Sequence, residues 1–552
     1  MELLPNGELL VFSEKMLYHL DAANCTIRPA DGFQSTKLMM RSAMTTWRGA
    51  QIYWFSRISD PENNAGADLM RLHQGHEEIF PFPETMRPLW KRLIPGKAGH
   101  LWLIVGRLVW DLAPAETPDF NAPDYVFDAV PTVLKYDRSD NIWVGTNGYG
   151  LRKINHLQGL FNAGADNWTL NGVWVHQGRY FAKWVNEIRT YDPSTRAFSD
   201  QPAFPDAPVL QVSMVFEPTG TTWLLAATEE KNPRQMLLRY APGSQGPAER
   251  IYTFATPLNL RDPMLRARDG RIWIATHGGK LVCFDPARAH FDYFDAGHLF
   301  GDQASVVRSV AIAEDADGTI WVGTILGLVK CTPTPDGLNF ALTQADSGNP
   351  NGLNNNSIAC ILPTANDQLW LGTKGGGINV MDTRTGRCRH ITTANGLLNN
   401  VVYGILAGNR PDEYWCSTNR GLAKINVRSH DPFDFTVTTY TAELGLQDNE
   451  FNTQAYYKAD SGELLFGGIN GLNHFFPEKL PQDTVPPPVY TVGVEINHQP
   501  AGMALLGGPP ELLTRLELDH NQNNLSFEFA ALDFTAPAKN RYRYRLSGLD
   551  DD

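Results

Sequence analysis

Amide, cationic and aromatic side chains follow a short motif that recurs along this 552-residue chain. Amide and charged groups can hydrogen-bond hydroxyl groups, and an aromatic face can cover the C–H patch of a sugar ring. Asparagine is also common in turns, because it tolerates left-handed backbone and bonds its own main chain, so turn formation is the alternative for each amide. We predict a ligand-binding surface from these candidates: Asn147, Tyr149, His277, Lys374, Asn419, Arg420, Asn452 and Asn470.

Motifs for catalysis are incomplete in this sequence. His76-Glu77-Glu78 lacks the second histidine of a zinc-protease motif, and Gly243-Ser244-Gln245-Gly246 lacks the spacing of a nucleophile elbow. Gly375-Gly376-Gly377 is not followed by the Lys-Ser/Thr pair of a phosphate-binding loop. We therefore predict no catalytic residues, no metal and no cofactor. Carboxylates are abundant, so a pair acting as a glycosidase stays open as an alternative.

The charge and cysteine content exclude several classes of partner. A net charge of −13 and a pI near 5.6 disfavour nucleic acid, because phosphate binding requires a basic face. The six cysteines show no CxxC spacing, so we predict small buried hydrophobic residues instead of zinc or redox sites. The sequence as given has no run of 18 apolar residues and no evident signal peptide.

The motif that precedes the candidate residues runs from Asp315 to Lys330 and has close copies on both sides. Its tryptophans are Trp273, Trp321, Trp370 and Trp415, which lie 48, 49 and 45 residues apart. A fixed period of this size is typical of repeat architectures, because one unit cannot bury its apolar face until neighbours stack on it. The spacing therefore predicts stacked, similar units.

Each unit reads as four short antiparallel strands. Asp317-Gly318 predicts a tight hairpin turn, and Thr324 with Gly327 brackets a second turn. On the strand between them, Trp321 and Gly323 face one way while Ile320 and Val322 face the other. A tryptophan beside a glycine suits sheets packed face to face, since the ring and the backbone can approach closely. Four strands in about 45 residues match a propeller blade, and a β-sandwich would not need so regular a period.

Eleven segments carry the repeat, which is too many for one common propeller of roughly four to eight blades. We predict an all-β chain with two propellers in tandem: a partial one over residues 1–160 and a seven-bladed one over 161–480. The structural repeat residues are Trp143, Trp273, Trp321, Trp370, Trp415, Gly323 and Gly372. The segments lie at residues 6–12, 51–55, 100–103, 141–146, 172–175, 220–225, 269–276, 315–330, 367–373, 414–422 and 461–472.

The sequence changes character after residue 480. Pro481 and Pro486-Pro487-Pro488 predict a stiff linker over 481–488. Leu525, Phe527 and Phe529 then alternate with small or polar residues, as in a half-buried strand. We predict a truncated immunoglobulin-like sandwich over 489–552, and we expect the whole chain to be a segment of a longer protein.

A propeller gathers two sets of loops on one face, namely those between its second and third strands and those that enter its first strands. These loops are the default binding surface. The ligand candidates fall in them, and further asparagines enter first strands at Asn354, Asn355, Asn399, Asn400 and Asn449.

The motif Asp-Gly-x-Ile-Trp-Val-Gly-Thr resembles the two-component regulator propeller repeat. Residues 445–452 and 466–477 are similar to the final blade of that family, and residues 523–550 resemble the start of its triple-tyrosine domain. The order of these parts is more specific than any single motif. The resemblance covers essentially the whole chain, strongly from about residue 137.

The resemblance implies a periplasmic sensor of a hybrid two-component system of Bacteroidetes. In that family a transmembrane helix connects the sensor to a histidine kinase and a DNA-binding response regulator, and the sensor pairs through its C-terminal domain. The implied ligand is an oligosaccharide from polysaccharide breakdown, and the implied output is control of carbohydrate-utilisation genes. A secreted propeller that acts as a polysaccharide lyase or glycosidase is the alternative, and a scaffold for protein partners is a third interpretation.

Overall fold

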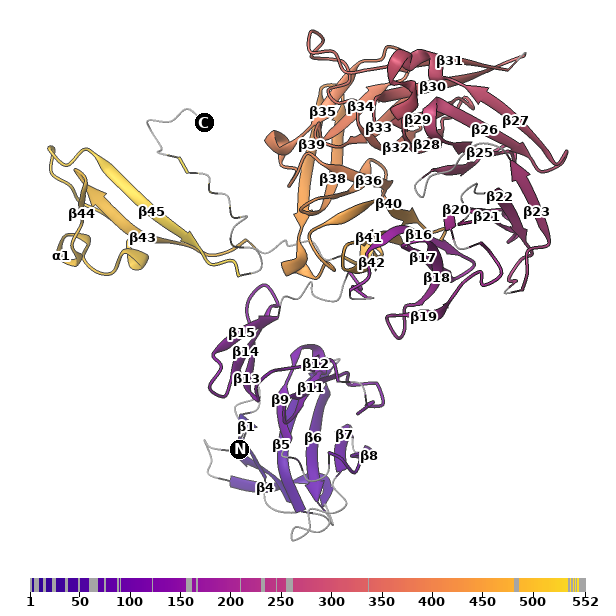
Figure 1. Ribbon diagram of the computed structural model, residues 1–552. Coiled ribbons are helices and arrows are strands. Elements are labelled where there is room, and N and C mark those ends of the chain that lie inside the picture. Colours follow the sequence, from indigo (N-terminus) through magenta and orange to yellow (C-terminus); the bar gives the residue numbers. More distant parts are fainter. Residues whose placement is uncertain are drawn as a thin grey trace. The chain divides into compact units, whose positions relative to one another are not determined.

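The computed structural model of the chain is built almost entirely of short antiparallel strands (Figure 1). It divides into two compact units, one formed by residues Met1–His156 with Asp483–Asp552 and the other by Leu157–Gln482. The structure describes residues 2–545 except 4–8, 13–15, 22–25, 35–37, 48–49, 59–67, 74–75, 87–88, 90, 122, 155–160, 165–166, 209, 230–233, 245, 255–261, 336, 481–485, 535–536, 538–539, 541 and 543.

The unit of residues 157–482 holds seven antiparallel sheets among its described residues, each built from consecutive strands. Six sheets have four strands and the last has three. The strands are β16 (Leu170–His176), β17 (Arg179–Trp184), β18 (Glu187–Asp192) and β19 (Ala197–Pro202); β20 (Leu210–Phe216), β21 (Thr222–Ala227), β22 (Gln235–Tyr240) and β23 (Arg250–Phe254); β24 (Met264–Arg266), β25 (Ile272–Ala275), β26 (Lys280–Asp285) and β27 (His290–Asp295); β28 (Ser309–Glu314), β29 (Ile320–Thr324), β30 (Gly327–Thr334) and β31 (Gly337–Thr343); β32 (Ile358–Thr364), β33 (Gln368–Thr373), β34 (Ile378–Asp382) and β35 (Cys388–Ile391); β36 (Val402–Ala407), β37 (Glu413–Thr418), β38 (Gly421–His430) and β39 (Phe433–Tyr440); and β40 (Phe451–Lys458), β41 (Leu464–Gly468) and β42 (Gly471–Phe475).

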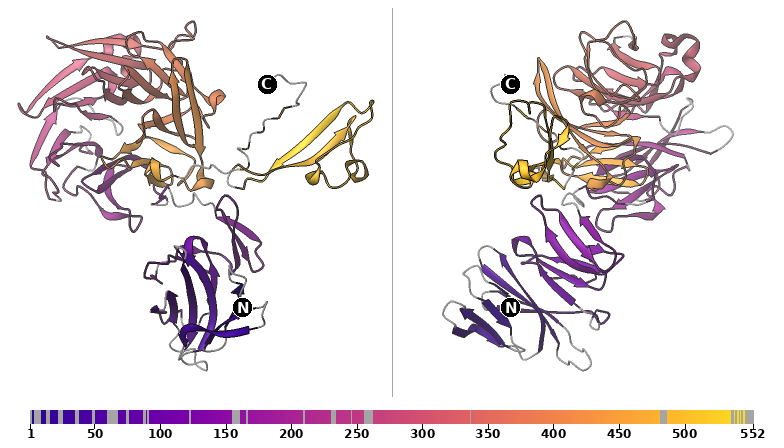
Figure 2. Two further views of the ribbon diagram at one scale, coloured as in Figure 1. Left: turned by 180° about the vertical axis from the view of Figure 1, so that it is seen from behind. Right: turned by 90° about the vertical axis from the view of Figure 1, so that its left-hand side faces the viewer.

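These seven sheets follow one another around a ring, as the views from the front and from behind show (Figures 1 and 2). The first strand of the first sheet, β16, packs against the first strand of the last sheet, β40. The segment before β16 supplies a further pairing, because Gly164 forms an antiparallel bridge with Leu472 of β42. Residues from the two ends of the unit thus meet in the last sheet, and the ring is closed.

The sheet of β28–β31 shows why this sequence makes four strands. Asp315 organises the first turn, since its Oδ1 accepts the backbone N–H groups of Asp317 and Thr319 at 3.0 Å each. Gly318 completes the turn at a φ of 80°, where a side chain would be strained. Oδ2 of Asp315 accepts the indole N–H of Trp321 at 2.7 Å, so the turn and the next strand are joined. The predicted turn and strand order are confirmed here.

The two faces of β29 contact different neighbours, as the alternation predicts. Ile320 and Val322 lie in a buried cluster with Trp273 of the preceding sheet. Trp321 lies in a cluster with Ile358 of the following sheet. A Cβ on Gly323 would lie 2.8 Å from Cγ2 of Ile358, which is closer than real contacts allow. The glycine therefore permits the close approach of neighbouring sheets.

The repeat tryptophans are part of this packing. Trp273 and Trp321 are each 3% exposed, while Trp370 and Trp415 are fully buried. Trp143 is half-buried and donates its indole N–H to Asp137 at 2.9 Å, in the same relation as Trp321 to Asp315. Burying a large aromatic side chain contributes several kcal/mol, on the order of the loss seen on truncation to alanine (~3–5 kcal/mol). These residues hold sheet against sheet.

The other unit contains four sheets in residues 2–154 and one near its C-terminal end, within the described residues. The first four are β1 (Glu2–Leu3), β2 (Leu9–Phe12), β3 (Met16–Asp21) and β4 (Thr26–Gln34); β5 (Leu38–Trp47), β6 (Ala50–Ile58), β7 (Asp68–His73) and β8 (His76–Pro81); β9 (Lys91–Pro95), β10 (Leu101–Val105), β11 (Leu108–Leu112) and β12 (Tyr125–Val126); and β13 (Pro131–Tyr136), β14 (Ile142–Thr146) and β15 (Leu151–Ile154). The fifth sheet is formed by β43 (Val489–Ile496), β44 (Gln499–Pro500) and β45 (Leu525–Ala531), beside helix α1 (Met503–Leu506).

The all-β class and the four-stranded sheets are confirmed by these elements. One repeat assignment is wrong: Trp174 lies on β16, the first strand of its sheet, whereas the other repeat tryptophans lie on second strands. Gln177 and Gly178, both with positive φ, form the turn that leads into the true second strand. The tandem of two propellers, the domain limits and the immunoglobulin-like sandwich stay predictions, and most of the linker falls outside the described residues.

The cysteines that the structure describes are buried and unpaired, as the sequence predicts; they are Cys283, Cys331, Cys360, Cys388 and Cys416. Burial raises the pKa of their thiols, to about 12 for Cys416. Cys25 lies outside the described residues. Across the described part of the chain, no helix has the length and apolar character needed to cross a membrane.

Candidate functional site

Loops after second strands meet the segments that enter the next sheet, on one face of the ring. Gly278 donates its N–H to the carbonyl of Val307, and Gly421 donates to that of Asn449. Both hydrogen bonds join main-chain groups, so they do not depend on side-chain type. The two predicted sets of loops therefore lie together at the sheet boundaries.

A threonine at the end of the second strand fastens several of these loops. Its hydroxyl donates to a carbonyl three or four residues later, which closes the loop on itself. The pairs in the ring are Thr324 with Gly327 at 2.8 Å, Thr373 with Gly377 at 2.9 Å, Thr418 with Gly421 at 2.9 Å and Thr276 with Lys280 at 3.4 Å. Thr146 and Gly150 form the same bond at 2.8 Å in the other unit. The loop after Thr276 has the longest of these bonds.

Asparagine side chains fasten the loop of residues 374–377. Asn379, fully buried, accepts the N–H of Asn354 at 3.1 Å and donates to its Oδ1 at 2.9 Å. Asn354 in turn donates to the carbonyl of Gly376 at 2.9 Å, and the carbonyl of Asn400 accepts the N–H groups of Gly375 and Gly377. These amides serve the backbone.

The predicted asparagines of the last two sheets also bond groups within the protein. Asn419 accepts the hydroxyl of Tyr403 at 2.8 Å, and Asn452 donates to the carbonyl of Leu170 at 2.9 Å. Asn470 accepts the N–H of Asn167 at 2.7 Å and donates to the carbonyl of Gln447 at 3.2 Å. Contacts to Leu170 and Asn167 join the last sheet to the first, so these two asparagines help to close the ring.

The remaining candidates are more exposed. Lys374 and Arg420 lie at the tips of their loops, after β33 and β37 respectively. Asn147 and Tyr149 lie between β14 and β15 in the other unit, and the Tyr149 side chain is 73% exposed. Six of the eight predicted residues therefore belong to the ring, and Asn147 and Tyr149 belong to the other unit.

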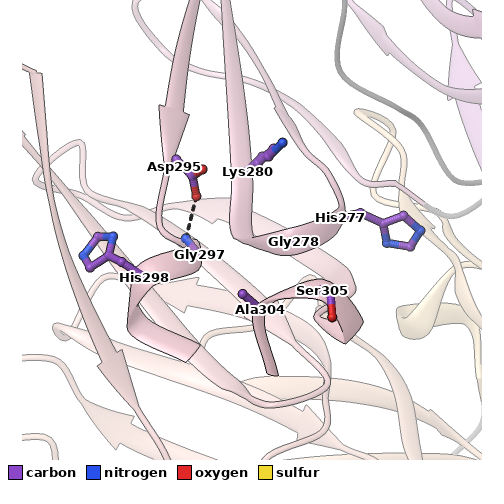
Figure 3. Close-up of a pocket in the computed structure, with 8 residues that line it drawn as sticks. All are labelled: His277, Gly278, Lys280, Asp295, Gly297, His298, Ala304 and Ser305. Atoms are coloured by element: carbon purple, nitrogen blue, oxygen red, sulfur yellow. Dashed lines mark hydrogen bonds between the residues drawn. The ribbon is translucent and has the colours of Figure 1, made fainter. Parts of the chain in front are cut away.

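His277 is the predicted candidate that lines a pocket in the ring. The pocket has a volume of about 530 Å³ and lies where the sheet of β24–β27 meets that of β28–β31. In Figure 3, His277 and Lys280 lie on one side of it, and Asp295 turns toward the N–H of Gly297, which it accepts at 2.7 Å. The lining residues are His277, Gly278, Lys280, Asp295, Gly297, His298, Ala304 and Ser305.

The wall of the pocket is the 3₁₀ segment η3 (Gly297–Val306), which connects β27 to β28. Gly301, at a φ of 54° and a ψ of −131°, bends this segment in the middle. Phe300 and Val307 anchor it in the buried cluster below. The result is a short, bent segment that lies beside the loop of His277–Gly279 and has both ends fixed.

The polar groups of the pocket differ in charge state. Burial lowers the pKa of His277; a hydrogen bond with Val307 opposes this, and the charge of Arg308 adds to it. The imidazole is therefore neutral near pH 7; one nitrogen donates to Val307, and the other can accept a hydrogen bond. Lys280 and Arg308 are exposed and form no ion pair within the described residues, so they keep their positive charge available.

Sequence reasoning missed Lys280, Asp295, His298 and Ser305. A signal was present, because the corresponding entry segments of later sheets read Asn351-Gly352-Leu353, Asn395-Gly396-Leu397 and Leu444-Gly445-Leu446. The segment before β28 reads Ala296-Gly297-His298 and continues for several more residues. This longer entry segment departs from the repeat, and the departure indicates the position of the pocket.

Metal coordination finds no support in the part of the chain that the structure describes, where no group of three or more His, Cys, Asp or Glu side chains could hold an ion. The arrangement offers a neutral imidazole, a hydroxyl, a lysine and one carboxylate around an open hollow. Such a set can hold a polar ligand by hydrogen bonds.

Two segments of the chain, residues 303–325 and 352–375, match the family described as Two component regulator propeller. Both segments include an entry loop and the residues around it, and the first also spans the motif of Trp321. The match therefore covers the repeat and part of the pocket wall.

Histidine kinase P4 of Formosa agariphila is similar to this chain, at 26% identity over 301 residues. The alignment covers 52% of this chain and 21% of that protein. The chain thus spans about a fifth of the length of this curated relative.

Among solved structures, the chain is similar to the extracellular domain of a hybrid two component system from B. thetaiotaomicron, at 16% identity and a TM-score of 0.42. That match covers 100% of this chain and 73% of the other. A second extracellular domain from the same organism has 14% identity and a TM-score of 0.33, covering 97% of this chain and 88% of the other. The sequence matches and the sheets together show that this chain carries propeller repeats of the two-component regulator type.

Proposed function

We propose that this chain is the extracellular, periplasmic sensor region of a hybrid two-component system and that it binds an oligosaccharide from polysaccharide breakdown. The observation that carries the proposal is the match of two repeats to the Two component regulator propeller family. The relative from Formosa agariphila is named a histidine kinase, which supports a kinase as the output. The regulated genes would be those for carbohydrate use.

The pocket of His277 supplies a place for the ligand. Its neutral imidazole and the hydroxyl of Ser305 suit sugar hydroxyls, and the open hollow admits a chain of sugar residues. Variation among the loops at the sheet boundaries would set the specificity, because the sheets below are held by repeated contacts. We assign no catalytic residue in this chain.

Calorimetry and thermal shift against a panel of oligosaccharides test this function, with analysis of the products in parallel. We expect one class of saccharide to bind and to raise the melting temperature with no change in the saccharide. New reducing ends or unsaturated products would instead identify a hydrolase or a lyase. Failure of every saccharide to bind would contradict the proposal.

Pairing of two copies through residues 489–552 is part of the same proposal. β45 is an edge strand in the order β44–β43–β45, and Phe527 and Phe529 on it are 45% and 40% exposed. Exposed apolar edge strands favour association with another strand. Sedimentation of the chain with and without ligand measures this pairing. A monomer under both conditions would contradict it.

A further inference from the structure

The pocket of His277 and the adjoining Arg308 present more free positive charge than the rest of this acidic chain suggests. The net charge is −13, yet Lys280 lines the pocket, and Arg308 directly follows Val307, whose carbonyl accepts the N–H of the pocket residue Gly278. Neither cation forms an ion pair within the described residues. Unpaired cations beside a pocket attract anions, because the local charge acts at short range while distant charges are screened by salt.

The one carboxylate that lines the pocket is partly occupied. Oδ1 of Asp295 accepts the N–H of Gly297 at 2.7 Å, which turns this carboxylate toward the start of η3. Lys280 is the cross-strand partner of Asp295 in the pairing of β26 and β27, but the two form no ion pair, and in Figure 3 the lysine points away from the carboxylate. Asp302, also on η3, does not line the pocket.

Further polar groups line the same pocket. The hydroxyl of Ser305 and the ring of His298 come from η3, and the ring of His277 comes from the facing loop. They can hold hydroxyl groups while the cations hold an acidic group. Beside the loop of residues 374–377, by contrast, the Asn354 side chain bonds the carbonyl of Gly376 and the Asn379 side chain bonds Asn354.

We propose that this pocket takes an oligosaccharide that carries an acidic group, a carboxylate or a sulfate, with Lys280 and Arg308 as the residues that select the charge. The inference rests on the proposed function, because it names the class of saccharide that the sensor binds. It also explains why an acidic chain would accept an acidic ligand: the selecting cations are local to one boundary between sheets.

Galactose oligosaccharides of matched length in three forms test the inference: unmodified, sulfated, and oxidised at C6 to the uronate. We expect the chain to bind one acidic form at least tenfold more tightly than the unmodified form, and the sulfated and uronate arms identify which acid is preferred. Lys280→Met and Arg308→Gln should each weaken that binding at least tenfold. Lys135→Met is the matched control, because Lys135 is an exposed lysine on β13 in the other unit.

The melting temperature of each variant shows that it is folded. Equal binding of acidic and unmodified saccharides would overturn the inference and leave the proposed function standing. Acidic binding that survives both substitutions would overturn the assignment to this pocket. Absence of binding by any saccharide, in this series and in the wider panel, would overturn both proposals.

Discussion

Two boundaries between neighbouring sheets of the ring use the same repeat in different ways. At the boundary after β33, the Asn354 side chain donates to the carbonyl of Gly376, and Asn379 holds Asn354 in place. The main-chain carbonyl of Asn400 accepts two N–H groups of the same loop, residues 374–377. At the boundary after β25, Gly278 bonds Val307, and η3 stands beside the loop to form a pocket. At the first boundary the polar side chains bond other groups of the protein, whereas at the second Lys280, His298 and Ser305 are exposed and line a pocket.

This difference shows how a repeat protein separates stability from recognition. The second strands at both boundaries carry a buried repeat tryptophan, Trp273 on β25 and Trp370 on β33, so the added segment leaves this packing in place. Gly372 follows Trp370, whereas Ala275 takes the corresponding place after Trp273. A longer entry loop therefore creates a site without altering the core. An asparagine in such a loop indicates a ligand contact only when no backbone group lies within its reach.

We expect the largest change in stability from a substitution that disrupts the packing between neighbouring sheets. A Cβ at Gly372 would lie 2.3 Å from Sγ of Cys360 and 2.8 Å from Cγ1 of Val402, on the next sheet. We expect Gly372→Ala to lower the free energy of unfolding by about 3 kcal/mol, because overpacking of a rigid core strains its neighbours. Chemical denaturation measures the change. Gly246→Ala is the control, since its nearest atom would be 3.7 Å away, and an equal effect of both substitutions would contradict the packing role of Gly372.

A smaller effect concerns a third boundary, where the ring closes. Glu463 is buried and accepts the hydroxyl of Tyr180 at 2.6 Å and Nδ1 of His474 at 2.7 Å. Tyr180 belongs to the first sheet, and the other two belong to the last. We expect Glu463→Gln to lower the free energy of unfolding by about 2 kcal/mol, because it removes a charged acceptor from two hydrogen bonds.

The pH dependence of this closure follows from the titration of Glu463. Burial by itself would raise the pKa of Glu463, but the bonds from His474 and Tyr180 outweigh it and hold the pKa below its ordinary value. A lowered pKa stabilises the fold above the unfolded-state value, near 4.3, and this contribution is lost as the pH falls through the folded-state pKa. The difference in stability between the parent chain and Glu463→Gln should therefore shrink below about pH 4.3. A constant difference from pH 7 to pH 3 in urea titrations would rule this out.

The smallest expected change in stability distinguishes the loop of residues 374–377 from the loop of His277. Asn379→Ala should destabilise the ring by about 1–2 kcal/mol, because it removes the two hydrogen bonds that the buried Asn379 side chain makes with Asn354. His277→Gln should change the unfolding free energy by roughly 0.5 kcal/mol or less, as for most substitutions away from the core. Urea denaturation of the pair measures both values. If the order were reversed, the 374–377 loop would not be the fastened one.

Much of the architecture follows from particular residues in the sequence. The turn at Asp315–Gly318, the opposite faces of Trp321 and Ile320, and the closing turn from Thr324 to Gly327 are all local properties of a few consecutive residues. The assignment of residues 172–175 to a second strand was wrong, because Trp174 lies on a first strand in a sequence that resembles the motif. Its true second strand, from Arg179 to Trp184, lacks the Trp-x-Gly pair and carries no signature.

The sequence by itself determined the repeating strands, the turns between them and the burial of the tryptophans, since these depend on alternation and on residues a few positions apart. Only the tertiary structure decided which polar side chains are used up. Asn452 meets Leu170 and Asn470 meets Asn167 because the ring returns to its start, roughly three hundred residues earlier in the chain. The pocket of His277 likewise exists because η3 bends at Gly301 while its ends stay anchored, a shape set by contacts and not by the repeat.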